Sequence, residues 1–86
     1  MTIYGNNFSL VLTGLLKNSG VTCYQIAEYT DLDQAYLSRL KTGEKTNPSP
    51  ETIMKIGLAL VHFCEKMTIH DIEWLFRSVR RSLIKD

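Results

Sequence analysis

Apolar residues recur at intervals of three and four along most of the chain, the spacing that places side chains on one face of an α-helix. In the segment 8–16 these positions are held by Phe8, Val11, Leu12, Leu15 and Leu16. Gly20 follows closely, and a glycine there commonly takes the left-handed conformation that ends a helix. The pattern therefore predicts a first helix that ends before Gly20.

Two shorter helices joined by a tight turn are predicted next. Thr22 begins the first of them, because Thr22 and Gln25 have the spacing of a capping box, in which each side chain satisfies a free amide of the other residue. Asp31 marks the turn, since aspartate tolerates the left-handed conformation better than most residues. Asp33 is the expected N-cap of the following helix, which ends before Gly43.

Two longer helices complete the prediction. Ser49 and Pro50 are the expected N-cap and first residue of a fourth helix, with Gly57 indicating a close contact between helices. Its inward stripe consists of Ile53, Ile56, Leu60 and Phe63. A fifth helix is expected from Thr68 to about Ile84, with a stripe of Ile69, Ile72, Phe76, Val79 and Leu83. Since no segment shows a period of two, the predicted fold class is all-α with five helices.

Length and composition predict one small domain over residues 1–86. The N-terminal residues lack a signal-peptide pattern and no apolar run is long enough to span a membrane, so a cytoplasmic protein with no membrane partner is expected. Cys23 and Cys64 are isolated and are expected to be free thiols rather than metal ligands. His62 and His70 are expected to be structural or surface residues rather than catalytic ones. No residues have a catalytic spacing, so we expect neither an enzyme nor a bound cofactor or metal.

The positive charges are concentrated, although the formal net charge is only +1. Arg39, Lys41 and Lys45 lie in one short segment, opposed by Glu44 alone. A second group near the C-terminus contains Arg77, Arg80, Arg81 and Lys85. For binding to a polyanionic partner, such local clusters of positive charge are more informative than the near-neutral net charge.

The third predicted helix, residues 33–42, has an unusually plain outer face. With Leu37 and Leu40 facing inward, Ala35 and Thr42 point almost directly away at 100° per residue, with Ser38 and Arg39 on either side. Gln34, Tyr36 and Lys41 fall on the flanks. A major groove is about 12 Å wide, so a helix that enters it needs small outward residues. Arginine and glutamine can read guanine and adenine, and an alanine can touch the thymine methyl.

Residues 8–60 resemble the repressor/Cro-type helix-turn-helix family of phage and bacterial regulators. The resemblance rests on Ile26-Ala27, on Leu37-Ser38-Arg39-Leu40 with Gly43, and on the segment 48–60. It implies a lambda-repressor-like domain that binds double-stranded operator DNA, usually as a homodimer, with residues 33–42 as the recognition helix. The base contacts that it implies are those of Gln34, Ala35, Ser38 and Arg39.

Backbone contacts are expected from the start of the second helix and from the end of the third helix and the loop after it. The candidates are Cys23, Tyr24, Tyr36, Lys41, Thr42, Lys45 and Asn47. For the lysines and Asn47 the alternative is a solvated surface, and for Tyr36 it is a partly buried flank. The chain departs from the family pattern at Cys23, where glutamine is frequent, and at Asp31, where glycine is usual. Asp33 caps well but places a carboxylate near the expected path of the phosphates.

Residues 61–86 match no pattern within the family, and their helix is the second candidate for function. Its apolar residues exceed what covering a four-helix core requires, which favours a homodimer interface, whereas packing on its own domain is the alternative. The predicted interface residues are Ile72, Leu75, Phe76, Val79 and Leu83. The sequence thus predicts a small, nucleoid-associated transcriptional regulator, bacterial or phage-encoded and acting as a repressor. The alternative is a helical interaction module with a protein partner, such as an antitoxin or anti-repressor.

Overall fold

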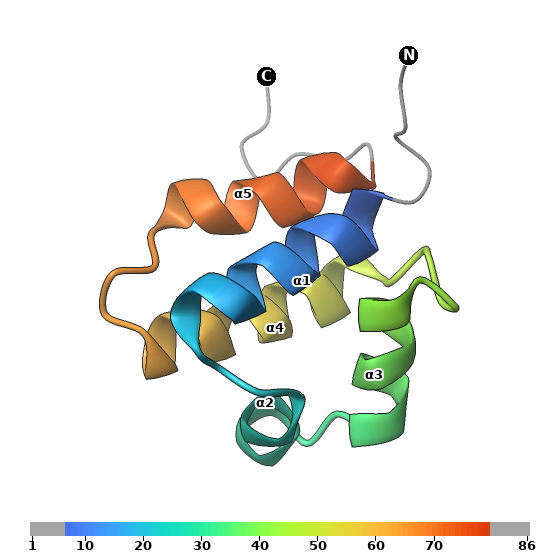
Figure 1. Cartoon of the computed structure of the whole chain (residues 1–86), viewed down its shortest axis with the longest axis horizontal. Helices are drawn as coiled ribbons and strands as arrows, with labels where there is room; N and C mark the ends of the chain where they lie inside the picture. The colour runs from blue at the N-terminus through green and yellow to red at the C-terminus, as the bar shows by residue number, and fades with distance from the viewer. Residues whose placement is uncertain (1–6, 80–86) are drawn as a thin grey trace.

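The computed structural model describes residues 7–79, which form five α-helices and no strand, as predicted. The helices are α1 (Asn7–Ser19), α2 (Cys23–Thr30), α3 (Gln34–Thr42), α4 (Pro50–Phe63) and α5 (Ile69–Ser78). Helices α1 and α5 lie side by side, and α4 packs against α5 and α2. Helix α3 stands across one end of this group, against α1 and α2 (Figure 1). Among the described residues no helix combines the length and the apolar character needed to cross a membrane.

Three helix starts form as the sequence predicts. At α2 the Thr22 hydroxyl accepts a hydrogen bond from the Gln25 amide at 3.1 Å, and the Gln25 side-chain oxygen accepts one from the Thr22 amide at 2.9 Å. The same reciprocal pair caps α5, where the Asp71 carboxylate accepts from the Thr68 amide at 2.9 Å. At α4 the Ser49 hydroxyl accepts from an amide of the first turn. These bonds satisfy amides that have no partner within the helix.

The predicted cap of α3 requires a correction. Asp33 occupies the N-cap position in an extended conformation, but its side chain makes no capping hydrogen bond. The carboxylate is exposed to solvent, which hydrates it well. The side chain of Asp33 therefore acts on α3 through its negative charge near the positive end of the helix dipole, while its carbonyl accepts from the Leu37 amide at 3.1 Å.

Two glycines and one aspartate end helices in the left-handed conformation. Gly20 follows α1 with a φ of 76°, Asp31 follows α2 with a φ of 66°, and Gly43 follows α3 with a φ of 92°. Asp31 is the only residue other than glycine with a positive φ in the described part of the chain. This conformation is costly for a residue with a Cβ, so the turn between α2 and α3 carries some strain.

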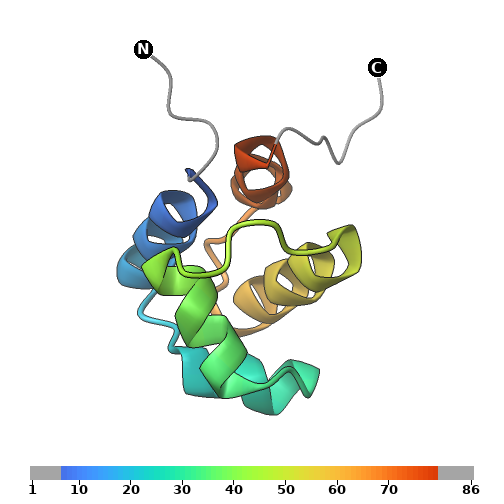
Figure 2. The same ribbon diagram turned by 90° about the vertical axis from the view of Figure 1, so that its right-hand side faces the viewer.

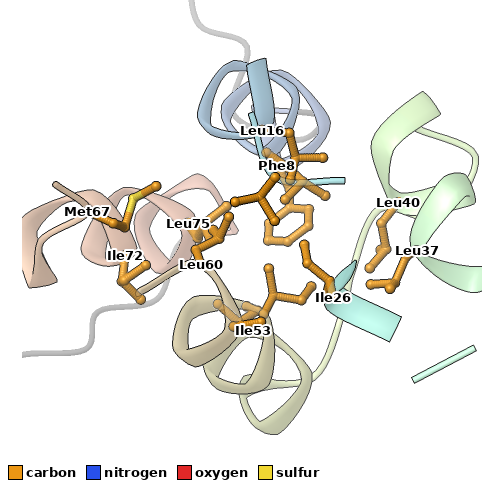
Figure 3. Close-up of a cluster of buried hydrophobic side chains, with 14 of the residues drawn as sticks. Phe8, Leu16, Ile26, Leu37, Leu40, Ile53, Leu60, Met67, Ile72 and Leu75 are labelled. Carbon is orange, nitrogen blue, oxygen red and sulfur yellow. The ribbon is translucent and has the colours of Figure 1, made fainter. Parts of the chain in front are cut away.

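All five helices contribute to one apolar core. Phe8 and Leu16 of α1 meet Ile26 of α2, Leu37 and Leu40 of α3, and the inner residues of α4 and α5 (Figure 3). Two expected core positions are wrong, since Phe63 is 39% exposed and Ile69 is 55% exposed. Phe63 instead contacts the rings of Tyr29 and His62 at the surface. Leu75, which is not among the predicted stripe residues of α5, is fully buried.

Gly57 forms the predicted close contact. A Cβ atom built there would lie 2.7 Å from Cγ2 of Ile72, so glycine lets α4 approach α5 at this point.

The end of α5 differs from the prediction. The helix ends at Ser78, where the Ser78 hydroxyl donates to the Leu75 carbonyl at 2.6 Å and the Val79 amide bonds back to Phe76. Such bonds compete with continuation of the helix. The residues that we expected to extend it, through Leu83 and Ile84, lie outside the described part, as do Arg80, Arg81 and Lys85.

Candidate nucleic-acid interface

The turn between α2 and α3 is held by local hydrogen bonds and by one apolar contact. The Thr30 hydroxyl donates to the Ile26 carbonyl at 2.7 Å and accepts from the Leu32 amide at 3.1 Å. Leu32 is half-buried and packs against the core. The turn therefore fixes the angle at which α3 leaves α2, and in the view of Figure 2 α3 lies at the front of the molecule.

The exposed face of α3 is the one that the sequence predicts. Leu37 and Leu40 are buried at 1% and 0% exposure, and they anchor the helix to α1 and α2. The residues of the opposite face are all exposed, namely Gln34, Ala35, Ser38, Arg39, Lys41 and Thr42. The centre of this face carries small side chains, so the helix presents a narrow ridge flanked by longer polar groups.

The polar side chains of this face differ in whether they already make hydrogen bonds within the protein. The side chains of Gln34 and Ser38 make no hydrogen bond to another residue in the described part of the chain. The Thr42 hydroxyl donates to the Arg39 carbonyl at 3.1 Å and accepts from the Glu44 amide at 3.4 Å. Gln34 and Ser38 are thus open to a ligand, whereas Thr42 is engaged in ending the helix.

A groove of about 600 Å³ adjoins the exposed face of α3. Its walls are the C-terminal half of α1, the start of α2 and the near side of α3. The lining residues are Thr13, Leu16, Lys17, Gly20, Val21, Thr22, Cys23, Tyr24, Gln34, Ser38 and Lys41. Two lysines, Lys17 and Lys41, face this groove together with the positive end of the α2 dipole. The groove thus suits a negatively charged group lying beside α3.

Lys17 is a member of this groove that our sequence analysis missed. It lies in the last turn of α1, where a basic residue suits the negative end of the helix dipole and needs no other role. The Thr13 hydroxyl donates to the Lys41 carbonyl at 3.3 Å, which helps to hold α1 against α3. No spacing in the sequence links Lys17 to Lys41, because their proximity depends on how α1 packs against α3.

The predicted backbone-contacting residues other than Lys41 and Thr42 fall into three groups. Cys23 and Tyr24 line the groove, with Cys23 half-buried against the core and Tyr24 exposed. Tyr36 is half-buried against the core, which is the flank position given above as its alternative. Lys45 and Asn47 are exposed in the loop between α3 and α4.

The predicted dimer interface on α5 requires a correction. Ile72, Leu75 and Phe76 are buried in the core of their own domain, at 3%, 0% and 5% exposure, because α5 covers both α1 and α4. Val79 is half-buried against the same core, and Leu83 lies outside the described residues. The three buried side chains are therefore not on the surface where a second protomer would meet them. The aromatic residue on the outer face of α5 is Trp74, which is 59% exposed.

The paired helices α2 and α3, their fixed turn and the exposed face of α3 define the class of helix-turn-helix domains. Comparison with protein families supports this assignment, since the helix-turn-helix family matches residues 15–60, more than half of the chain. The chain therefore belongs to the repressor/Cro-type helix-turn-helix family, a DNA-binding family that is typically non-enzymatic. Comparisons with curated proteins and with solved structures gave no significant match.

Proposed function

We propose that the protein is a small transcriptional regulator that binds operator DNA by placing α3 in the major groove. The observation that carries this proposal is the exposed face of α3, small at its centre, beside a groove that contains Lys17 and Lys41. Arg39 and Gln34 are the proposed readers of guanine and adenine, and Ala35 and Ser38 lie close to the bases. Acting at the nucleoid, such a protein represses by occupying its site.

The lysines of the groove are proposed to hold the phosphate backbone. Lys17, Lys41 and the start of α2 present positive charge on one side of α3, and Lys45 and Asn47 follow α3 in the loop to α4. Phosphate contacts of this kind fix the register of a recognition helix on the duplex, whereas contacts to base edges provide specificity. Loss of a phosphate contact is therefore expected to weaken binding to all sequences, whereas loss of a base contact is expected to reduce sequence preference.

We also propose that the protein binds DNA as a two-fold dimer, in which the two recognition helices read half-sites roughly 34 Å apart. The side chains buried in α5 do not supply this interface. The large apolar residues exposed elsewhere on α4 and α5 include Leu58, Val61 and Trp74, at 54%, 45% and 59% exposure. Light scattering of the protein alone and with a bound duplex would give its oligomeric state.

Selection of bound sequences from random DNA tests the proposal. The wild-type protein is expected to enrich a palindromic site, and Arg39→Ala is expected to lose preference at one base pair of each half-site, by about 1–3 kcal/mol. Lys66→Ala is the matched control, because Lys66 is exposed in the loop between α4 and α5. This loop lies at the opposite end of the molecule from α3 (Figure 1). Binding without any sequence preference by the wild-type protein would refute the base-reading role.

A second function is favoured by the exposed apolar residues of α4 and α5. In this alternative the protein is an interaction module, such as an antitoxin or anti-repressor, and Leu58, Val61 and Trp74 contact another protein. The expected result would then be a stable complex with a protein partner and no selective binding to DNA. Because the two activities can coexist in one chain, the DNA selection decides only whether α3 reads bases.

A further inference from the structure

The chain that follows α3 turns back over Arg39. Gly43 takes the left-handed conformation, and the amides of Gly43 and Lys45 both donate to the Arg39 carbonyl at 3.1 Å. The Thr42 hydroxyl donates to the same carbonyl. Glu44 lies between Gly43 and Lys45 in the sequence. The three hydrogen bonds to the Arg39 carbonyl therefore fix the backbone of Glu44 next to Arg39.

The side chains of Glu44 and Arg39 meet on this turn. Oε1 of Glu44 lies 3.9 Å from Nε of Arg39, and the two side chains are 68% and 48% exposed. The distance is within reach of an ion pair but too long for a hydrogen bond, and an exposed pair of this kind contributes little stability. The importance of the contact lies in its geometry, because the Glu44 carboxylate is on the Nε side of the Arg39 guanidinium.

This direction leaves the base-reading part of Arg39 open. A guanidinium has one N–H on Nε and four on its two terminal nitrogens, and a bidentate contact with guanine uses two N–H groups that point the same way. A carboxylate near Nε leaves the terminal nitrogens of Arg39 for the base. An approaching duplex excludes water from the pair, and the attraction between the two charges then increases.

We propose that Glu44 is a positioning residue that orients Arg39 and thereby determines specificity for guanine, an inference that rests on the proposed DNA-binding function. Glu44 is also the only acidic residue between positions 34 and 50, among Arg39, Lys41 and Lys45. Its charge repels phosphates of any sequence. Glu44 therefore lowers affinity for DNA in general while it raises discrimination at the base pair that Arg39 reads.

Substitution of Glu44 by glutamine tests both effects. The base pair read by Arg39 is first identified as the one at which Arg39→Ala loses preference. Glu44→Gln is expected to raise affinity for random duplex about twofold to threefold, through the loss of one repelling charge. It is also expected to lower discrimination at the identified base pair about fivefold. In the Arg39→Ala background the same substitution is expected to leave discrimination there unchanged.

Glu51→Gln is the matched control, since Glu51 is an exposed carboxylate that pairs with Lys55 at 3.7 Å rather than with Arg39. It is expected to leave discrimination unchanged at every base pair. Raised affinity of Glu44→Gln with unchanged discrimination would overturn the positioning role, as would an equal loss of discrimination at all base pairs. A wild-type protein that selects no DNA sequence would instead remove the proposed function itself. The two failures are therefore distinguishable.

Discussion

Substitution of Gly57 by alanine tests the contact between α4 and α5 on which the packing of α5 depends. The new Cβ would lie 2.7 Å from Cγ2 of Ile72 and 3.3 Å from its Cγ1 and Cδ1, whereas ordinary contacts are 3.4–4 Å. Ile72 is 3% exposed, and its Cγ2 is bonded directly to a branched Cβ whose rotation is restricted in a helix. The methyl group therefore has no easy movement away, and the helices must separate instead.

The size of the effect follows from two opposing terms. Alanine gains about 1 kcal/mol over glycine in a helix interior, whereas overpacking a well-packed core costs about 1–3 kcal/mol. Gly14 in α1 is the matched control, since a Cβ built there meets no atom within 4 Å. Gly14→Ala gains the propensity term alone, so the difference between the two variants isolates the packing cost at Gly57. We expect Gly57→Ala to be less stable than Gly14→Ala by about 2 kcal/mol.

Urea denaturation followed by circular dichroism would measure both variants against the wild-type protein. A difference of this size corresponds to a shift of the melting temperature on the order of 10 °C for a domain this small. Combining Gly57→Ala with Ile72→Ala should cost less than the sum of the two single substitutions, because the second change removes the obstructing methyl group. Equal stability of Gly57→Ala and Gly14→Ala would refute close packing of α4 on α5.

Three further predictions concern the turns and the groove. Asp31→Gly should raise the free energy of unfolding by up to about 1 kcal/mol, because glycine takes the left-handed conformation at φ 66° without strain; a loss of stability in urea denaturation would contradict this. Thr68→Ala should lower stability by about 1 kcal/mol through loss of the cap of α5, and unchanged thermal melting would argue against that cap. Lys17→Ala should weaken DNA binding about equally for all sequences and reduce the slope of log affinity against log salt by about 1 per protomer, unlike Lys66→Ala; an unchanged slope would remove Lys17 from the phosphate contacts.

Local chemistry explains which parts of the fold the sequence predicts well. The cap formed by Thr22 and Gln25 involves residues three apart, so its geometry depends only on the backbone between them. The rotation of α3 is likewise predictable, because Leu37 and Leu40 are its only strongly apolar residues and must face the core. The exposed face of α3, and with it the candidate site, follows directly from that rotation.

The remaining features depend on packing between segments that are distant in the sequence. The stripe of α5 is ambiguous because this helix covers both α1 and α4, so that Leu75 is buried while Ile69 is exposed. Lys17 joins the groove only because α1 packs against α3. The contact of Glu44 with Arg39 requires the backbone to turn back at Gly43, which no periodic pattern indicates. In each case the residues can be identified in the sequence, but the distance between them depends on how the helices and turns pack.

The distribution of charge around α3 has a consequence for how the helix meets a duplex. Asp31 and Asp33 are exposed at its N-terminal end and make no ion pair within the described residues, whereas Lys41 and Lys45 lie toward its C-terminal end. Phosphates are therefore repelled at the N-terminal end of α3 and attracted at the other end. A docked α3 should bring its C-terminal half closest to a phosphate backbone, with Gln34 inside the major groove of the DNA, against the base edges.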